Sequence, residues 1–172
     1  MSSGVAVRAL AAHEWRLLRE LRLAALADAP DAFGRTLAEE QPLPDAFWER
    51  QLADTVASPS KLSAVAEQDG RAVGIVYAAL APDAPAVAQL YSMWVAPSAR
   101  RSGAGRALVE AIAAWARSRG ATRLVLRVTQ GNLAAERLYE SAGLRFTDDA
   151  PSPVRDGSPL RARRMERALP SP

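Results

Sequence analysis

The sequence predicts one α/β domain built on a single mixed sheet, mostly antiparallel with a central parallel pair, and with helices on both faces. Three observations lead to this prediction. At 172 residues the chain has room for one core of ordinary size, so residues 1–172 should form a single domain. Two apolar runs, 61–67 and 71–80, flank Gln68-Asp69-Gly70 and predict an antiparallel hairpin. Over residues 90–143, strand, glycine turn, helix, strand and helix follow without a gap, and the helical crossover allows the two strands to be parallel.

The remaining elements are predicted from apolar periodicity and from turn residues. Pro44-Asp45 is a good helix entrance, and Phe47, Trp48 and Leu52 supply the inner face of that helix. In chain order, the other expected elements are a strand at 5–9, a helix at 13–27, a loop at 81–85, a strand at 88–95, a helix from 103 to 117–119, a strand at 124–128, a helix at 132–142, a mobile loop up to 159 and a strand at 160–168.

Composition narrows the class of protein. Apolar residues make up 49% of the chain and charged residues 24%, which are ordinary globular values. The chain has no cysteine, no apolar run long enough to span a bilayer and no signal-peptide pattern at Met1-Ser2-Ser3-Gly4, so we expect a cytoplasmic protein without a membrane partner. The formal net charge is only +3 and the arginines are spread along the chain, which argues against nucleic acid as a partner.

The turn between the strand ending at Val95 and the next helix carries the main chemical signal. Pro97 stops the strand, Gly103 and Gly105 remove Cβ atoms at the turn, and an apolar spacing then begins at Leu108. Free N–H groups at such a helix N-terminus favour an anion, most naturally a phosphate, although glycines also serve turns for conformational reasons alone. The turn is neither a Walker loop, which needs Lys-Ser/Thr after the glycine, nor a dinucleotide fingerprint, which needs a third glycine where Leu108 stands.

Two motifs in a fixed order carry a family resemblance. Arg100-x-x-Gly103-x-Gly105 directly follows a strand ending in Val-x-Pro, and Asn132-x-x-Ala135-x-x-Leu138-Tyr139-x-x-x-Gly143-Leu144 follows about one helix and one strand later. Over residues 90–146 this pattern resembles the Gcn5-related N-acetyltransferase (GNAT) family. The resemblance implies the acyl-CoA N-acyltransferase fold, acetyl-CoA as co-substrate, no metal, and transfer of the acetyl group to a primary amine on a small molecule or peptide. It leaves a homodimer open.

The resemblance also implies roles for particular residues. The pantetheine arm would lie along Met93, Trp94 and Val95, and a backbone N–H near Met93 or Trp94 would polarise the thioester. Asn132 would contact the arm, and it is also an ordinary helix N-cap. Tyr139 would protonate the departing thiolate, with plain packing as the alternative. The pyrophosphate would bind the turn's N–H groups, and the side chains of Arg100, Arg101 and Arg106 would add charge or remain exposed; the turn residues are Arg101, Ser102, Gly103, Ala104, Gly105 and Arg106.

The sequence does not identify which residue acts as the general base that removes the proton from the amine. Several relatives of this family use a glutamate at the position of Gln89, which cannot remove a proton. Tyr91 and Ser92 could order a water instead, and Glu39, Glu40 or Glu67 could supply a carboxylate. A group of acidic residues between the first two helices would attract a cationic amine or form a solvated loop; its members are Asp31, Glu39, Glu40 and Asp45.

Two alternative functions stay open at this point. The first is a catalytically silent acyl-CoA-binding module, which the glutamine at position 89 leaves open. The second is a nucleic-acid-binding domain, which predicts strongly salt-dependent binding and is disfavoured by the low net charge. The identity of the amine acceptor does not follow from the sequence.

Overall fold

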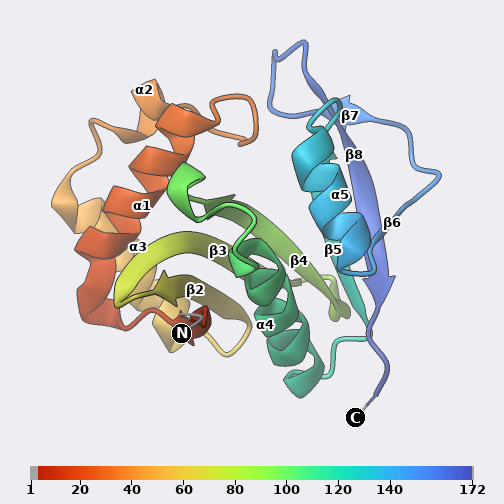
Figure 1. The fold of residues 1–172 in the computed structure, drawn as a ribbon, viewed down its shortest axis with the longest axis horizontal. Coiled ribbons are helices and arrows are strands. Elements are labelled where there is room, and N and C mark those ends of the chain that lie inside the picture. The colour runs from red at the N-terminus through yellow and green to blue at the C-terminus, as the bar shows by residue number, and fades with distance from the viewer. Residues whose placement is uncertain (1–3, 172) are drawn as a thin grey trace.

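One eight-stranded sheet forms the centre of the protein in the computed structural model, which describes residues 4–171 (Figure 1). The strands are β1 (Ala6–Ala9), β2 (Lys61–Gln68), β3 (Arg71–Ala81), β4 (Ala84–Val95), β5 (Arg123–Thr129), β6 (Arg145–Phe146), β7 (Ser152–Pro153) and β8 (Arg161–Ala168). The α-helices are α1 (Trp15–Asp28), α2 (Leu37–Glu40), α3 (Asp45–Ala57), α4 (Ala104–Ser118) and α5 (Leu133–Ser141), and the short 3₁₀ turns are η1 (Ala12–Glu14) and η2 (Pro97–Ala99).

The sheet is mixed, as the sequence predicts. Its strand order is β1-β2-β3-β4-β5-β8-β6, and β7 pairs with β8 outside that path. Every pairing is antiparallel except that of β4 with β5, which the α4 crossover connects. The prediction of a mostly antiparallel sheet with a central parallel pair is therefore confirmed.

The parallel pair is short, and this shapes the centre of the molecule. β4 and β5 are in register only from Val87 opposite Arg123 to Gln89 opposite Val125. Beyond that point β4 continues along β3 and β5 continues along β8, so the sheet divides into two halves with a wedge between them. β4 also carries a bulge there, because Ser92 and Met93 both lie opposite Val76 of β3.

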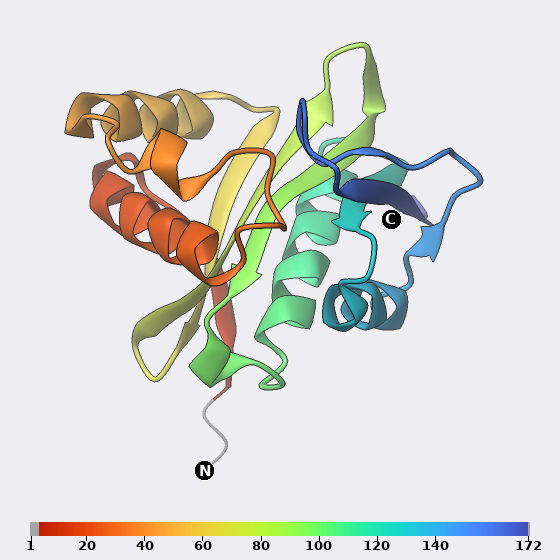
Figure 2. The ribbon, with the colours of Figure 1, turned by 90° about the horizontal axis from the view of Figure 1, so that it is seen from above.

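Helices cover the two faces of the sheet in separate layers (Figure 2). α1 and α3 pack on one face, where the core includes Leu26, Trp48 and Leu52. α4 lies on the other face over β2, β3 and β4, with Leu108 and Ile112 completely buried, and α5 contacts α4 on that side. The strongly amphipathic sequence of α4 explains this position, since its apolar residues recur at helical spacing.

Most element boundaries agree with the sequence prediction to within two or three residues, and three differences have local causes. β4 starts at Ala84 rather than at 88, because β3 and β4 form a tight hairpin that brings Ala81 opposite Ala84. The expected loop up to 159 contains β7, which pairs with β8. The short helix α2 was not predicted, and Thr36 caps it. Within the described residues, no helix has both the length and the apolar character needed to cross a bilayer.

Candidate active site

The glycine turn presents unpaired backbone donors at the start of α4. Gly103 is the N-cap residue with φ of 92°, and Arg101 also has a positive φ of 63°. Among residues 4–171, no group accepts a hydrogen bond from the backbone N–H of Arg101, Gly103, Gly105 or Arg106. These donors, together with the positive end of the helix dipole, form a suitable environment for a phosphate.

The arginines of this turn are not equivalent. Arg100 donates from Nε to the carbonyl of Val95 over 3.2 Å and forms an ion pair with Asp28. Asp28 also accepts a hydrogen bond from Trp94 Nε1 over 2.9 Å; this bond and the Arg100 guanidinium lower the pKa of the Asp28 carboxyl. The charge of Arg100 is therefore already compensated. Arg101 and Arg106 are exposed, and neither forms an ion pair within the described part of the chain.

Gly105 has a packing role that differs from the one expected for it. A Cβ atom added at Gly105 would lie 2.8 Å from Leu138 Cδ2 on α5. At Gly103, by contrast, an added Cβ would meet nothing within 4 Å. Gly103 thus provides the left-handed turn, and Gly105 allows α4 and α5 to approach closely. Replacement of Gly105 would disturb this helix contact whether or not it touched a phosphate.

A cavity of about 450 Å³ fills the wedge between β4 and β5. Met93 lines this cavity, whereas Trp94 packs its side chain against the α1 side of the sheet. Val95 does not line it either and packs on the core on the α4 side. The other residues that line the cavity include Gln89, Tyr91, Ser92, Asn132 and Tyr139.

α5 contributes two of the expected site residues to this cavity. Asn132 is the N-cap of α5, with Oδ1 accepting from the N–H of Ala135 over 3.3 Å, so the capping role is confirmed. Tyr139 is buried, and burial raises the pKa of its phenol to about 12. Its hydroxyl has no hydrogen-bond partner within residues 4–171. Tyr139 is therefore protonated at neutral pH, and its proton is not committed to another side chain.

A second, larger cavity of about 710 Å³ lies on the α1 and α3 side of the sheet. Tyr91 and Ser92 line both cavities, so these two residues of β4 form a border shared by the two spaces. The Tyr91 hydroxyl donates to Gln89 Oε1, and burial raises the pKa of Tyr91. Ser92 has a positive φ of 52° within the β4 bulge. Bulges commonly redirect side chains next to active sites, and this one places Ser92 at the junction.

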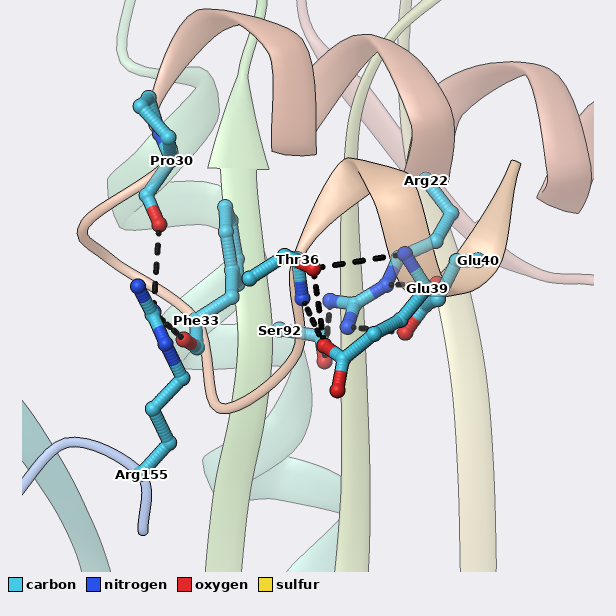
Figure 3. Close-up of polar contacts among 8 residues, drawn as sticks. All are labelled: Arg22, Pro30, Phe33, Thr36, Glu39, Glu40, Ser92 and Arg155. Atoms are coloured by element: carbon cyan, nitrogen blue, oxygen red, sulfur yellow. Dashed lines mark hydrogen bonds and ion pairs between the residues drawn. The ribbon is translucent and has the colours of Figure 1, made fainter. Parts of the chain in front are cut away.

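An arginine that was not expected in the site connects α1, α2 and β4 (Figure 3). Arg22 forms a bidentate ion pair with Glu40, at 2.9 Å from Nε and 2.8 Å from Nη2, and donates from Nη1 to Ser92 Oγ over 3.1 Å. The Arg22 and Glu40 side chains are 14% and 6% exposed. A signal was present in the sequence, since Arg22 lies on the apolar face of α1 between the buried Leu18 and Leu26.

Three of the four acidic residues in the group between the first two predicted helices, Glu39, Glu40 and Asp45, have side chains engaged in structural contacts. Glu40 is paired with Arg22. Glu39 accepts hydrogen bonds from the Thr36 backbone over 2.6 Å and from its hydroxyl over 2.9 Å, and these bonds lower the pKa of Glu39. Asp45 lies 3.6 Å from Arg19. The expected recruitment of a cation by this group is therefore not supported, because Glu40 alone of the four acidic residues lines either cavity.

The segment after α1 joins the two halves of the divided sheet (Figure 3). Arg155, in the turn after β7, donates to the carbonyls of Phe33 at 3.1 Å and Pro30 at 3.4 Å. Thr129 at the end of β5 donates to the carbonyl of Asp31 over 3.0 Å. Phe33 also lines the wedge cavity, so this segment forms part of its wall. By contrast, Glu67 pairs with Arg8 of β1 and lines neither cavity.

Comparison with known families agrees with this geometry. Residues 19–144 match the model of the acetyltransferase (GNAT) family. The chain belongs to the GNAT family. Aminoglycoside N(6')-acetyltransferase type 1 of Klebsiella aerogenes is 36% identical to it over 104 residues, which are 58% of this chain and 67% of that protein. Mycothiol acetyltransferase of Stackebrandtia nassauensis is 32% identical over 152 residues, 86% of this chain, which spans about half (47%) of that relative.

Solved structures of GNAT acetyltransferases share the fold. A GNAT-family acetyltransferase from Streptococcus pneumoniae superposes with a TM-score of 0.80 at 20% identity, covering 97% of this chain and 100% of that one. Spermidine N-acetyltransferase from Vibrio cholerae, solved with CoA and spermine, has a TM-score of 0.78 at 16% identity. The superposition covers 96% of this chain and 95% of the Vibrio cholerae chain. The sheet with its single parallel pair is thus the acyl-CoA N-acyltransferase fold.

Proposed function

We propose that this GNAT protein is an acetyl-CoA-dependent N-acetyltransferase that transfers the acetyl group to a primary amine by direct attack. The observation that carries the proposal is that the same two residues of β4, Tyr91 and Ser92, line both cavities. A thioester in the wedge and an amine in the larger cavity would meet there without a covalent enzyme intermediate. Such proximity is a large part of catalysis in a two-substrate reaction.

The residues around the wedge fit coenzyme A. The four unpaired N–H groups of the glycine turn suit the pyrophosphate, and Arg101 and Arg106 are available to add charge. β4 has no register partner on its β5 side beyond Gln89, so its backbone there can hydrogen-bond an extended arm as an added strand would. Asn132 on α5 adds a polar side chain to the same cavity.

The chemistry requires a proton donor and a route for the amine proton. Acetyl-CoA would supply the activated acetyl thioester. The amine nitrogen attacks the carbonyl carbon, a C–N bond forms, the C–S bond breaks, and Tyr139 donates its proton to the departing sulfur. The amine proton leaves to water, which Tyr91 and Ser92 can hold at the junction, because the one carboxylate lining the described cavities, Glu40, is paired with Arg22.

The proposal is tested by incubating the purified protein with acetyl-CoA and a panel of primary amines while free thiol and acetylated product are measured. We expect thiol release that depends on the amine and yields an equal amount of N-acetylated product. Calorimetric titration with acetyl-CoA separates the alternative function. Binding of acetyl-CoA without turnover of any amine would identify a silent acyl-CoA-binding module instead.

A further inference from the structure

The larger cavity has an unusual balance of charge for a site that takes an amine. Four charged side chains line it: Arg22 from α1, Arg35 from the segment before α2, Glu40 at the end of α2 and Lys61 at the start of β2. Three are cationic and one is anionic, so the lining carries two net positive charges. A protonated amine entering this space would be repelled unless the rest of the ligand compensated the charge.

The single carboxylate of this lining is not available to a ligand. Both oxygens of Glu40 are bound by Arg22, and the pair is nearly buried. A site for a polyamine or an aminoglycoside needs free carboxylates to pair with several ammonium groups, and none lines this cavity among residues 4–171. Such polycations are therefore poor candidates for the acceptor.

The remaining two cations are available. Lys61 is exposed and forms no ion pair with a described residue. Arg35 is exposed too; it interacts with Glu39 only at longer range, and the Glu39 carboxylate is held by Thr36. Arginine and lysine side chains at the rim of a cavity are well suited to bind a carboxylate.

The floor and walls of the same cavity are largely apolar. They include Leu18, Phe47, Trp48, Ile75, Tyr77 and Leu80. Its volume of about 710 Å³ is typical of a site for a small molecule. The lining thus combines an apolar surface, free cations at its edge, and the junction with the wedge cavity at Tyr91 and Ser92.

From this combination we infer that the acceptor is an amine that also carries a carboxylate and an apolar side chain, such as an amino acid or a short peptide. In this arrangement Arg35 or Lys61 binds the carboxylate, the apolar lining holds the side chain, and the amine lies toward Ser92. The carboxylate also offsets one of the two net positive charges that would otherwise repel the amine. The inference rests on the proposed function, because it names the acceptor of that reaction.

The decisive experiment compares L-phenylalanine with 2-phenylethylamine, which has the same ring and amine but lacks the carboxylate. Spermidine and kanamycin serve as polycationic acceptors. We expect kcat/KM, corrected for the fraction of neutral amine, to be at least about tenfold higher for L-phenylalanine than for 2-phenylethylamine. The double variant Arg35→Gln/Lys61→Gln should lose most of this preference while the KM for acetyl-CoA stays constant.

Arg71→Gln is the matched control. Arg71 begins β3, whereas Lys61 pairs with Ala79 near the end of that strand, and Arg71 lines neither cavity. This variant should keep the preference for L-phenylalanine over 2-phenylethylamine. Equal or better use of 2-phenylethylamine or of a polycation would overturn the inference, as would a preference that survives the double variant. Calorimetric titration of the CoA-loaded protein with the same two ligands separates this result from the proposed function. Tighter binding of L-phenylalanine that depends on Arg35 and Lys61, without turnover of any amine, would support the ligand class inferred for this cavity and reject its role as an acceptor.

Discussion

The indole Nε1 of Trp94 donates a hydrogen bond to the carboxylate of Asp28 over 2.9 Å, and the same carboxylate pairs with Arg100. Asp28 is the last residue of α1, Trp94 lies near the end of β4, and Arg100 leads into the glycine turn. One carboxylate therefore connects α1, which lines the larger cavity, to the two segments expected to bind coenzyme A.

Removal of this carboxylate should destabilise the protein. Asp28→Ala leaves the largely buried indole N–H of Trp94 without its acceptor, which costs about 1–2 kcal/mol in the free energy of unfolding. Urea unfolding at neutral pH measures this loss.

The lowered pKa of Asp28 means that its charge stabilises the fold above the ordinary pKa of the group, and that this contribution disappears as the pH falls through the lowered value. The difference in stability between the parent and Asp28→Asn should shrink accordingly on acidification; a constant difference would contradict this assignment.

The ion pair of Arg22 with Glu40 gives a sharper stability test. Glu40→Gln leaves a nearly buried guanidinium without its counter-charge, and we expect a loss of about 3–5 kcal/mol in the free energy of unfolding. The double variant Arg22→Met/Glu40→Leu removes both charges and should lose less than the single variant. Equal losses in the two variants would show that packing, rather than the uncompensated charge, determines the effect.

Tyr139→Phe should lower kcat strongly with little effect on stability. The phenol has no hydrogen-bond partner within the described residues, so its removal breaks no structural contact. A general acid contributes about 10²- to 10⁴-fold, and this loss should appear in kcat rather than in the KM for acetyl-CoA. Single-turnover kinetics establish that the measured rate is that of the chemical step rather than of product release. A near-native rate would assign Tyr139 to packing alone.

The pH dependence of kcat/KM should follow the acceptor amine rather than the protein. Burial raises the pKa of Tyr139 to about 12, so the phenol stays protonated up to about pH 10. Its ionisation therefore causes no decrease in kcat/KM below that pH. Because Glu40 is paired with Arg22, we expect no carboxylate to accept the amine proton, and only the neutral amine should react. The value of kcat/KM should then rise about tenfold per pH unit until the pKa of the amine is reached. Profiles for two amines of different pKa should have different midpoints. A common midpoint near neutral pH would reveal a general base on the protein.

Gly105→Val should destabilise the contact between α4 and α5. The added side chain begins 2.8 Å from Leu138 Cδ2, which is the end of a half-buried side chain that can shift, so we expect a cost at the low end of overpacking, about 1 kcal/mol. The double variant Gly105→Val/Leu138→Ala should recover part of that loss relative to the sum of the single variants, which chemical unfolding of all four proteins measures. Additive losses would mean that the two positions do not interact.

Much of the fold was predictable because its signals are local. Gln68-Asp69-Gly70 identified the β2–β3 hairpin, and the spacing around Leu108 identified α4. The wedge has no comparable local signal, because it arises where β5 leaves β4 to pair with β8, and β8 comes more than thirty residues later in the chain. The exact pairing of such distant strands is not encoded in any local pattern.

The residues of the candidate site also fall into two groups, those with a local sequence signal and those that only distant packing brings together. Asn132 and Tyr139 belong to one motif on one helix, and both line the wedge cavity. Arg22 and Glu40 were not predicted as a pair, because eighteen residues separate them and α2 has only one turn. Ser92, which Arg22 contacts, lies a further fifty-two residues along the chain from Glu40. Only the packed structure brings these three together.

The left-handed backbone at Ser92 limits which side chains can replace it at the border of the two cavities. Ser92 borders both cavities, so it is an obvious position for a mutant library aimed at new substrates. Its φ of 52° is well tolerated by glycine, asparagine and aspartate and is costly for valine, isoleucine or threonine. A library that varies residue 92 freely would therefore yield many poorly folded proteins, whereas Tyr77, which lines the larger cavity from β3 with a negative φ, can be varied without that backbone restriction.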